Sequence, residues 1–225
     1  MATTVIFEEQ VEIPMDLRGL SDFRRWTHSD QFPERGRIDY VAGHIEVDMS
    51  PEDVFCHGKL KGVLFASIFR HAQEDGLGHA FTDCTRVSVP DAAISVEPDI
   101  VLVTNEALET GRVRLVAKAG QPDRYIELEG PPDLIVEIVS DSSVTKDTKR
   151  LPPAYARAGV REFWLADARK EPLVFQVHRL AGDVYQPVEP DGENLIRSDV
   201  LSCRVRLEGQ RDARGFWKFE LVERA

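Results

Sequence analysis

Glu137 is the residue whose position most clearly suggests chemistry, because it interrupts an otherwise apolar run. It lies within Leu134 to Val139, a segment that is typical of a strand buried on both faces. An unpaired charge buried there costs several kcal/mol, so a metal ion, a base or a basic side chain must compensate it. Upstream, Asp99 begins the apolar segment Ile100 to Val103. If the two strands are neighbours, both carboxylates converge, and such oxygen ligands are those that Mg²⁺ prefers.

The same two carboxylates also have a purely structural interpretation. Asp99 would close a turn after Pro98, and Glu137 would pair with an arginine. The residues alone leave both interpretations open. No P-loop, HExxH or GxSxG motif offers another catalytic centre. The four histidines between His44 and His79 match no standard zinc spacing.

Two elements before Asp99 have clear sequence signals. Residues 37–47 alternate in polarity and predict a hairpin that turns at residues 42–43. A long helix is predicted to begin with Ser50 as its cap and Pro51 in its first turn. It is predicted to end at the glycines within 76–78.

Beyond this helix the chain is mostly strand. Residues 111–129 predict a protruding hairpin, and a short helix over 153–158 ends at Gly159. The other predicted strands are 79–89, 97–104, 134–139, 160–167, 173–180, 184–188, 200–207 and 215–222. This order of elements predicts a mixed sheet with helices packed on it.

The length of 225 residues suits one domain. Within it we expect an N-terminal arm over residues 1–36, formed by a short extended piece and a capped helical turn at Ser21 to Trp26. The core is expected over residues 37–180. Residues 181–225 are expected to form a C-terminal β extension packed on that core.

A combination of short motifs resembles a known family. The motifs are Glu97 to Val103, Pro132 to Ser140, Asp147, Tyr155 and Gly159 to Leu165. Together they resemble the Uma-type family of bacterial restriction-endonuclease-like proteins, which belongs to the PD-(D/E)XK nuclease superfamily. The resemblance spans about residues 37–180, most of the chain.

This resemblance implies an α/β fold of the PD-(D/E)XK restriction-endonuclease-like type. A mixed central sheet would be flanked by helices, with extra antiparallel strands at the C-terminus. It further implies that Asp99 and Glu137 are catalytic residues that bind Mg²⁺ or Mn²⁺. The metal would polarise a phosphodiester bond of DNA and activate the attacking water.

The position of the catalytic lysine is where the chain departs from the pattern. The superfamily usually has a lysine two residues after the glutamate, where this chain has Val139. The family is thought to supply its lysine from the following helix, and that position falls on Leu151. Because prolines 152–153 disturb helix geometry, a shifted helix start could bring Lys149 into the role, with Lys146 as second candidate. A solvated loop is the alternative for this stretch.

The resemblance also implies supporting residues. Asp39 takes the place of a glutamate in the hairpin, one methylene shorter, and Glu46 is the alternative on the next strand. His57 is expected to orient the acidic cluster, unless it is an ordinary packed core histidine. Ser140 follows a Glu-x-x-Ser pattern and is expected to form local hydrogen bonds.

The charge balance restricts how such a protein could bind DNA. With 28 Lys and Arg against 39 Asp and Glu, the net charge is −11, which excludes a globally basic nucleic-acid binder. Binding would need local basic patches, and dimerisation would place two of them along one duplex. The candidate residues are Arg24, Arg25, Lys59, Lys61 and the hairpin arginines Arg112, Arg114 and Arg124.

The remaining composition favours a cytoplasmic protein without membrane association. No apolar run approaches the roughly 20 residues of a membrane span, and no secretory signal is visible. Three widely spaced cysteines form neither a disulfide framework nor a metal knuckle.

The leading hypothesis is therefore a Mg²⁺-dependent DNA endonuclease that forms homodimers. A catalytically reduced nuclease-fold protein with a binding or regulatory role is the first alternative, favoured by Val139 and Leu151. A phosphodiesterase acting on RNA or nucleotides is the second.

Overall fold

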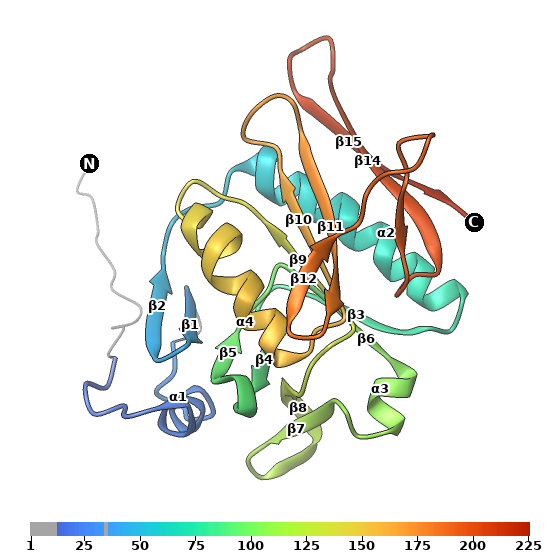
Figure 1. The fold of residues 1–225 in the computed structure, drawn as a ribbon. Coiled ribbons are helices and arrows are strands. Elements are labelled where there is room, and N and C mark those ends of the chain that lie inside the picture. Colours follow the sequence, from blue (N-terminus) through green and yellow to red (C-terminus); the bar gives the residue numbers. More distant parts are fainter. Residues whose placement is uncertain (1–12, 34–35) are drawn as a thin grey trace, which may run out of the picture.

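A six-stranded mixed sheet runs through the middle of the computed structural model, which describes residues 13–33 and 36–225 (Figure 1). Its strand order is β12-β11-β10-β9-β6-β3. β9 and β10 are parallel, and the other neighbouring pairs are antiparallel. The strands are β3 (Gly78–Thr82), β6 (Ile100–Thr104), β9 (Leu134–Ile138), β10 (Glu162–Asp167), β11 (Val174–Ala181) and β12 (Val184–Pro187).

A second six-stranded sheet has the order β2-β1-β5-β4-β8-β7. The predicted hairpin over 37–47 is confirmed, since β1 and β2 turn at Ala42 and Gly43, whose φ angles are 48° and 91°. The hairpin over 111–129 is confirmed as β7 and β8. The strands are β1 (Arg37–Val41), β2 (His44–Asp48), β4 (Arg86–Val89), β5 (Ile94–Val96), β7 (Arg114–Lys118) and β8 (Gln121–Glu129).

The C-terminal residues form a three-stranded antiparallel sheet. It consists of β13 (Ile196–Ser198), β14 (Cys203–Arg211) and β15 (Trp217–Arg224). β12 lies before it in the chain but pairs with β11 in the central sheet. The separate sheet therefore begins at Ile196.

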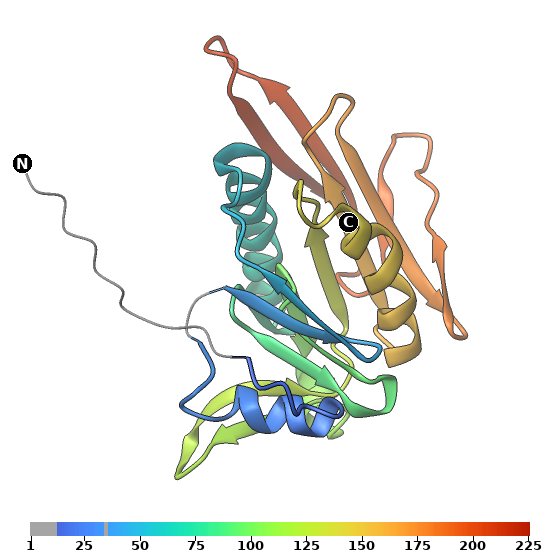
Figure 2. The same ribbon diagram turned by 90° about the vertical axis from the view of Figure 1, so that its left-hand side faces the viewer.

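Both faces of the central sheet are covered, which explains the continuous apolar character of its strands. Helix α4 (Leu151–Ala158) and the second sheet cover one face, and α2 (Leu60–Glu74) with the C-terminal sheet covers the other (Figure 2). In β9, Ile135 belongs to the first core, whereas Leu134 and Val136 belong to the second. The alternation of a strand therefore directs Glu137 toward α4 and the second sheet.

The long helix begins later than the sequence predicted. Its first turns are a π-helix, η1 (Val54–Lys59), which continues into α2. The cap is Asp53, whose carboxylate accepts the backbone N–H groups of Phe55 and Cys56 at 2.8 and 2.5 Å. Ser50 is not the cap, because it lies outside the helix and donates its own N–H to Asp48.

The segment before α4 is helical, but it is not an ordinary α-helix. Residues Lys146–Arg150 form a π-helix, η3, and α4 follows with Pro152 and Pro153 in its first turn. Proline has no N–H and clashes with the carbonyl four residues earlier in an α-helix. A π turn pairs residues five apart, so this wider turn accommodates the prolines. Gly159, at φ 86°, ends the helix as predicted.

The N-terminal helix α1 (Leu20–Thr27) packs on the second sheet. Its Phe23 and Trp26 are buried beside Ile38 and Tyr40 of β1. The predicted helical turn is confirmed, but it begins at Leu20 without a side-chain cap, so Ser21 is inside the helix. The extended piece predicted at the start of the arm lies outside the described residues.

Two short elements complete the fold. They are the 3-10 turn η2 (Pro90–Ala92) and helix α3 (Asn105–Glu109), which Thr104 caps. No helix in the described part of the chain has the length and apolar character needed to cross a membrane.

Candidate active site

Asp99 and Glu137 lie on neighbouring strands. Ile100 of β6 pairs with Val136 of β9 in antiparallel register, so Asp99, one residue before β6, stands opposite Glu137. The Asp99 carboxylate accepts the backbone N–H of Ile138 at 2.8 Å. Both carboxylates are buried, with exposures of 0% and 1%. The structure thus brings together the two residues that the sequence singled out.

Three basic side chains surround the Asp99 carboxylate. Arg37 donates to Oδ1 at 2.8 Å, His57 Nε2 lies 3.4 Å from Oδ2, and Lys61 Nζ lies 3.7 Å from Oδ1. Burial alone would raise the pKa of Asp99, but the hydrogen bond from His57 and the charges of Arg37, His57 and Lys61 hold it below its usual value. Asp99 is therefore ionised.

Glu137 has the opposite environment. Its Oε1 accepts a hydrogen bond from the hydroxyl of Tyr155 at 2.5 Å. Its Oε2 is buried and has no hydrogen-bond partner among the described residues. Burial, followed by the negative charges of Asp99 and Asp147, raises the pKa of Glu137 well above its usual value. Glu137 is thus a carboxyl group whose ionised form needs a cation.

Asp147 is a further buried carboxylate of this site, and the sequence analysis assigned it no role beyond its place in the family motif. It lies in the π turn η3 and is 1% exposed. Its Oδ2 accepts the hydroxyl of Ser143, while Oδ1 is buried without a hydrogen-bond partner in the described part of the chain. Burial raises the pKa of Asp147 to about 6, and Asp99 adds to the shift.

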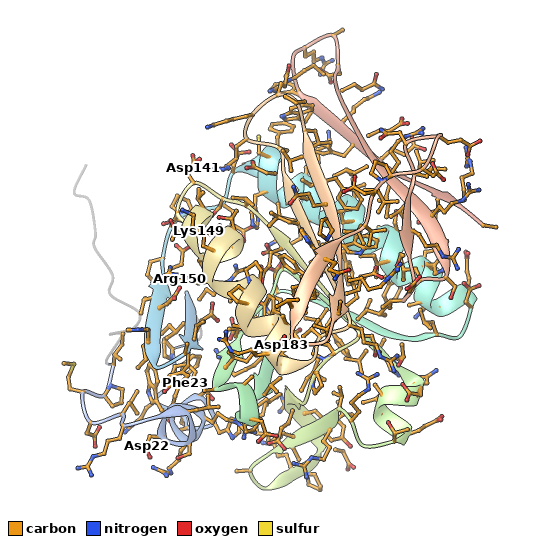
Figure 3. The ribbon with its side chains drawn as sticks, in the orientation of Figure 1. Asp22, Phe23, Asp141, Lys149, Arg150 and Asp183 are labelled. Carbon is orange, nitrogen blue, oxygen red and sulfur yellow. The ribbon has the colours of Figure 1, made fainter. Side chains whose placement is uncertain are left out.

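Lys146, rather than Lys149, reaches the acidic residues. Its Nζ lies 2.5 Å from Asp39 Oδ2, and the side chain is buried. Lys149 is exposed at the start of the helix, beside Arg150, which pairs with Glu46 of β2 (Figure 3). The π turn accounts for this difference, because it turns Lys146 inward and leaves Lys149 in solvent.

Leu151, the position to which the resemblance assigned the lysine, is a core residue. It is fully buried in the core between α4 and the sheets. The position to which the resemblance assigned the family's lysine is therefore an apolar core position in this chain.

Asp39 uses both of its carboxylate oxygens within the protein. Oδ1 accepts the backbone N–H of Glu97 at 2.9 Å, and Oδ2 contacts Lys146. Ser140 forms local hydrogen bonds to Ser143. Because Ser143 in turn donates to Asp147, Ser140 supports this carboxylate indirectly.

His57 lies between two carboxylates. Its Nδ1 is 3.2 Å from Glu52 Oε2, in addition to the contact of Nε2 with Asp99. Glu52, His57 and Asp99 can present ligand atoms within 4.8 Å of one another. However, Lys61 Nζ contacts both oxygens of Glu52, at 2.9 and 3.1 Å, and already supplies a cation there. Burial lowers the pKa of His57, but Asp99 and Glu52 outweigh it and raise the pKa overall.

Arg37 was not identified from the sequence. It lies at the start of β1, and its guanidinium faces Asp99, Glu137 and Asp39, whose charges outweigh burial and raise its pKa. A basic residue two positions before Asp39 was the available signal. Its significance depends on the register of β1 against the central strands, which local sequence does not specify.

Two adjoining clefts lead to this cluster from solvent. One, of about 450 Å³, is lined by Arg37, Glu52 and His57. The other, of about 520 Å³, is lined by Lys146 and Arg150. Both clefts also share residues 48–50 as lining. The buried carboxylates are therefore close to accessible surface.

Many of the predicted DNA-contacting side chains are engaged within the protein. Lys59 donates to the backbone carbonyl of Trp217, and Arg124 donates to Gln121. Five form ion pairs with carboxylates: Arg24, Arg25, Lys61, Arg112 and Arg114. The basic surface is thus less continuous than the sequence suggested.

Comparisons with known proteins agree with this architecture. A family model, Uma2, described as "Putative restriction endonuclease", matches residues 20–208. A crystal structure described as that of a putative nuclease belonging to DUF820 from Anabaena variabilis ATCC 29413 matches with a TM-score of 0.55. Sequence identity is 19%, and the match covers 82% of this chain and 90% of that chain. No curated protein matches the chain.

The structural match supports the fold, and the family match confirms the resemblance inferred from the motifs. It also extends that resemblance to α1 and to most of β14. The arrangement is the predicted one, a mixed central sheet flanked by helices with a C-terminal antiparallel sheet. Because the family model spans most of the sequence, the chain belongs to the Uma2 family of restriction-endonuclease-like proteins.

Proposed function

We propose that this protein is a metal-dependent endonuclease that hydrolyses phosphodiester bonds of DNA. Asp99 and Glu137 would bind Mg²⁺ or Mn²⁺. The observation that carries the proposal is Glu137 Oε2, a buried carboxylate oxygen without a hydrogen-bond partner among the described residues. A buried acceptor left unpaired costs about 1–3 kcal/mol, and a divalent cation would remove that cost.

The chemistry of the residues present suits such an ion. In this structure the ligand atoms of Asp99, Glu137 and Asp147 do not form a group within 4.8 Å of one another, so metal binding would draw these side chains together. Glu137 Oε2 and Asp147 Oδ1 both lack partners in the described part of the chain, and Asp99 stands opposite Glu137. These are carboxylate oxygens, which are the ligands that Mg²⁺ and Mn²⁺ favour. We therefore include Asp147 as a third ligand. When bound, the metal would polarise the scissile phosphate and lower the pKa of a coordinated water.

The chain's own residues have distinct roles in this proposal. Lys146, held by Asp39, supplies the positive charge that the superfamily lysine usually provides, and it stabilises the negative charge that develops on the phosphate. Tyr155 holds Glu137 Oε1, which leaves Oε2 as the oxygen that would bind a metal ion. His57 is a positioning residue, because it contacts Asp99 and stabilises its ionised form.

Nicking of supercoiled plasmid tests the function directly. The wild-type protein would be assayed with Mg²⁺ or Mn²⁺ beside Glu137→Ala and Asp99→Ala. We expect cleavage that both substitutions and a chelator abolish. Equal background cleavage by all three proteins would exclude a DNA nuclease.

Two observations favour a second function, that of a catalytically reduced nuclease-fold protein that binds or regulates. Arg37 already donates to Asp99 Oδ1, and Leu151 occupies the position of the family's lysine. In that case the protein would bind DNA but not cut it under any metal condition. Binding by gel shift, without nicking, would support this alternative.

We also propose that the protein acts in the cytoplasm as a homodimer, since two copies would present two active sites to the two strands of a duplex. Sedimentation velocity of the purified chain tests the dimer. A single monomeric species over the accessible concentration range would contradict it.

A further inference from the structure

The tip of the β14–β15 hairpin forms an aromatic and cationic surface beside η1. The hairpin projects past the start of this π-helix (Figure 1). The rings of Phe55 and Phe216 stack with centroids 4.8 Å apart and planes 5° apart. Phe216 nevertheless keeps 45% of its surface exposed. One side of the ring is thus supported by Phe55, and much of the remainder is open to a ligand.

Lys59 fixes this pair to the hairpin. Its Nζ lies 5.4 Å from the centroid of the Phe55 ring and 2.5 Å from the backbone oxygen of Trp217. Arg211 in turn lies over the Trp217 ring at 4.2 Å. The aromatic surface is therefore held in place by two cations that approach it from η1 and from the hairpin.

The charge at the tip is positive, although the whole chain is acidic. Asp212 is used within the turn, where its carboxylate accepts the N–H groups of Arg214 and Phe216 at 2.8 and 2.9 Å. Arg211 pairs with Glu171. Arg214 and Lys218 are exposed and form no ion pair with the described residues.

We refer to Phe55, Lys59, Arg214, Phe216 and Lys218 as the hairpin-tip patch. Glu208 and Glu220, which pair further along the hairpin, bound it on one side.

We propose that the hairpin-tip patch binds a single-stranded segment of nucleic acid. An exposed ring offers a stacking surface to an unpaired base, and neighbouring lysine and arginine side chains contact the phosphates. Arg214 and Lys218, which are exposed beside one small aromatic pair, suit a polyanion as a partner better than they suit an apolar protein surface. The proposal rests on the proposed function, because the strand held here would be the substrate.

The position of the patch relative to Asp99 follows from η1. This π-helix carries Phe55 and Lys59 toward the hairpin, while His57 of the same helix contacts Asp99. The patch and the site therefore both adjoin the same short helix, η1. The family match ends at residue 208, so the tip of the hairpin lies beyond the matched region.

Fluorescence anisotropy of the full chain tests the patch without any need for cleavage. The probe is a fluorescein-labelled single-stranded oligodeoxynucleotide, titrated in the presence of chelator. We expect Phe216→Ala to weaken binding about tenfold. Phe216→Leu, which keeps an apolar side chain but removes the ring, should lose as much, whereas Phe216→Trp should retain binding.

The cations are tested by salt dependence. The slope of log K against log salt is negative, and each lost phosphate contact reduces its magnitude by about 0.7 for a single strand. The double variant Arg214→Ala/Lys218→Ala should therefore reduce the magnitude of the slope by about 1.4. Matched controls are Phe69→Ala and Arg70→Ala on α2, which are also exposed, at 40% and 59%. We expect the controls to bind like the parent.

The outcomes separate this inference from the nuclease proposal. Unchanged binding by Phe216→Ala, or an equal loss in the controls, would overturn the patch. Loss of a dimer by Phe216→Ala in sedimentation velocity, without a change in oligonucleotide affinity per subunit, would overturn it too. If no protein nicks plasmid but the expected binding pattern holds, the nuclease proposal fails, and the patch binds a nucleic acid that is not a substrate. Thermal melting confirms that each variant is folded.

Discussion

Lys146 and Lys149 are three residues apart in the chain, but only Lys146 is placed to act on the acidic cluster. We expect Lys146→Ala to reduce single-turnover DNA cleavage by about 10²–10³-fold, the usual effect of removing one charge-stabilising group. Lys149→Ala should leave cleavage unchanged, because this side chain is exposed. The melting temperature of both variants must be measured, since Lys146→Ala leaves the buried Asp39 carboxylate without its cation. Equal activity of the two variants would contradict the assignment.

The raised pKa of Asp147 gives metal binding a defined pH dependence. A carboxyl with a pKa of about 6 binds a proton below that value, and the proton competes with the metal. Mn²⁺ affinity measured by calorimetry should therefore rise between about pH 5 and pH 7. Asp147→Asn should bind Mn²⁺ more weakly and lose that part of the pH dependence. A variant with the same pH profile as the parent would show that Asp147 is not a ligand.

At this scale the sequence identified Asp99 and Glu137, because a charge within an apolar strand is anomalous wherever that strand lies. It did not identify Arg37 or a role for Asp147. Their burial depends on the register of β1 and on the π turn, and neither leaves a local pattern. The same turn places Lys146, and not Lys149, beside the acidic residues, whereas the sequence ranked Lys149 first; which lysine acts in catalysis stays a prediction.

At the scale of elements, the π turn η3 accommodates Pro152 and Pro153 at the start of α4. Leu151, the position to which the resemblance assigned the family's lysine, is fully buried in the core. Leu151→Lys should therefore destabilise the protein by several kcal/mol, since a buried charge without a partner is costly. Leu151→Met, which conserves volume, should cost less than about 1.5 kcal/mol. Urea denaturation of both variants measures the difference, and a stable, more active Leu151→Lys protein would refute this view of the helix.

The cap of η1 gives a second test at this scale. Asp53→Ala should lower the free energy of unfolding by about 1 kcal/mol, because two backbone N–H groups lose their acceptor. Ser50→Ala is the matched control, and urea denaturation should show no change for it. A larger loss of stability for Ser50→Ala than for Asp53→Ala would instead support Ser50 as the helix cap, as the sequence predicted.

Local signals located most elements but not their partners. The turn at Ala42 and Gly43 and the stop at Gly159 are short-range features, and both were predicted correctly. Ser50 and Asp53 are both good capping residues, so composition could not choose between them. The pairing of β12 with the central sheet joins strands through tertiary contacts, and a local pattern does not encode it.

At the scale of the whole molecule, metal binding should be visible as stability. A ligand that binds only the folded state, at 100 times its dissociation constant, stabilises it by about 2.7 kcal/mol. Mg²⁺ should therefore raise the melting temperature of the wild-type protein, and a chelator should reverse the rise. Glu137→Ala should show no such response. An equal rise in the variant would indicate binding elsewhere.

The cations around Asp99 and Asp39 have a consequence for the order in which the protein matures. Arg37 and Lys146 neutralise these two carboxylates from within the chain, so the hydrophobic layers can close before any ion arrives. This differs from small zinc domains, in which metallation and folding are one event. Folded protein without a bound metal ion would therefore be able to accumulate in the cell. The free concentration of divalent ions, and not the rate of folding, would then determine the fraction of the protein that holds a metal ion and can cleave DNA.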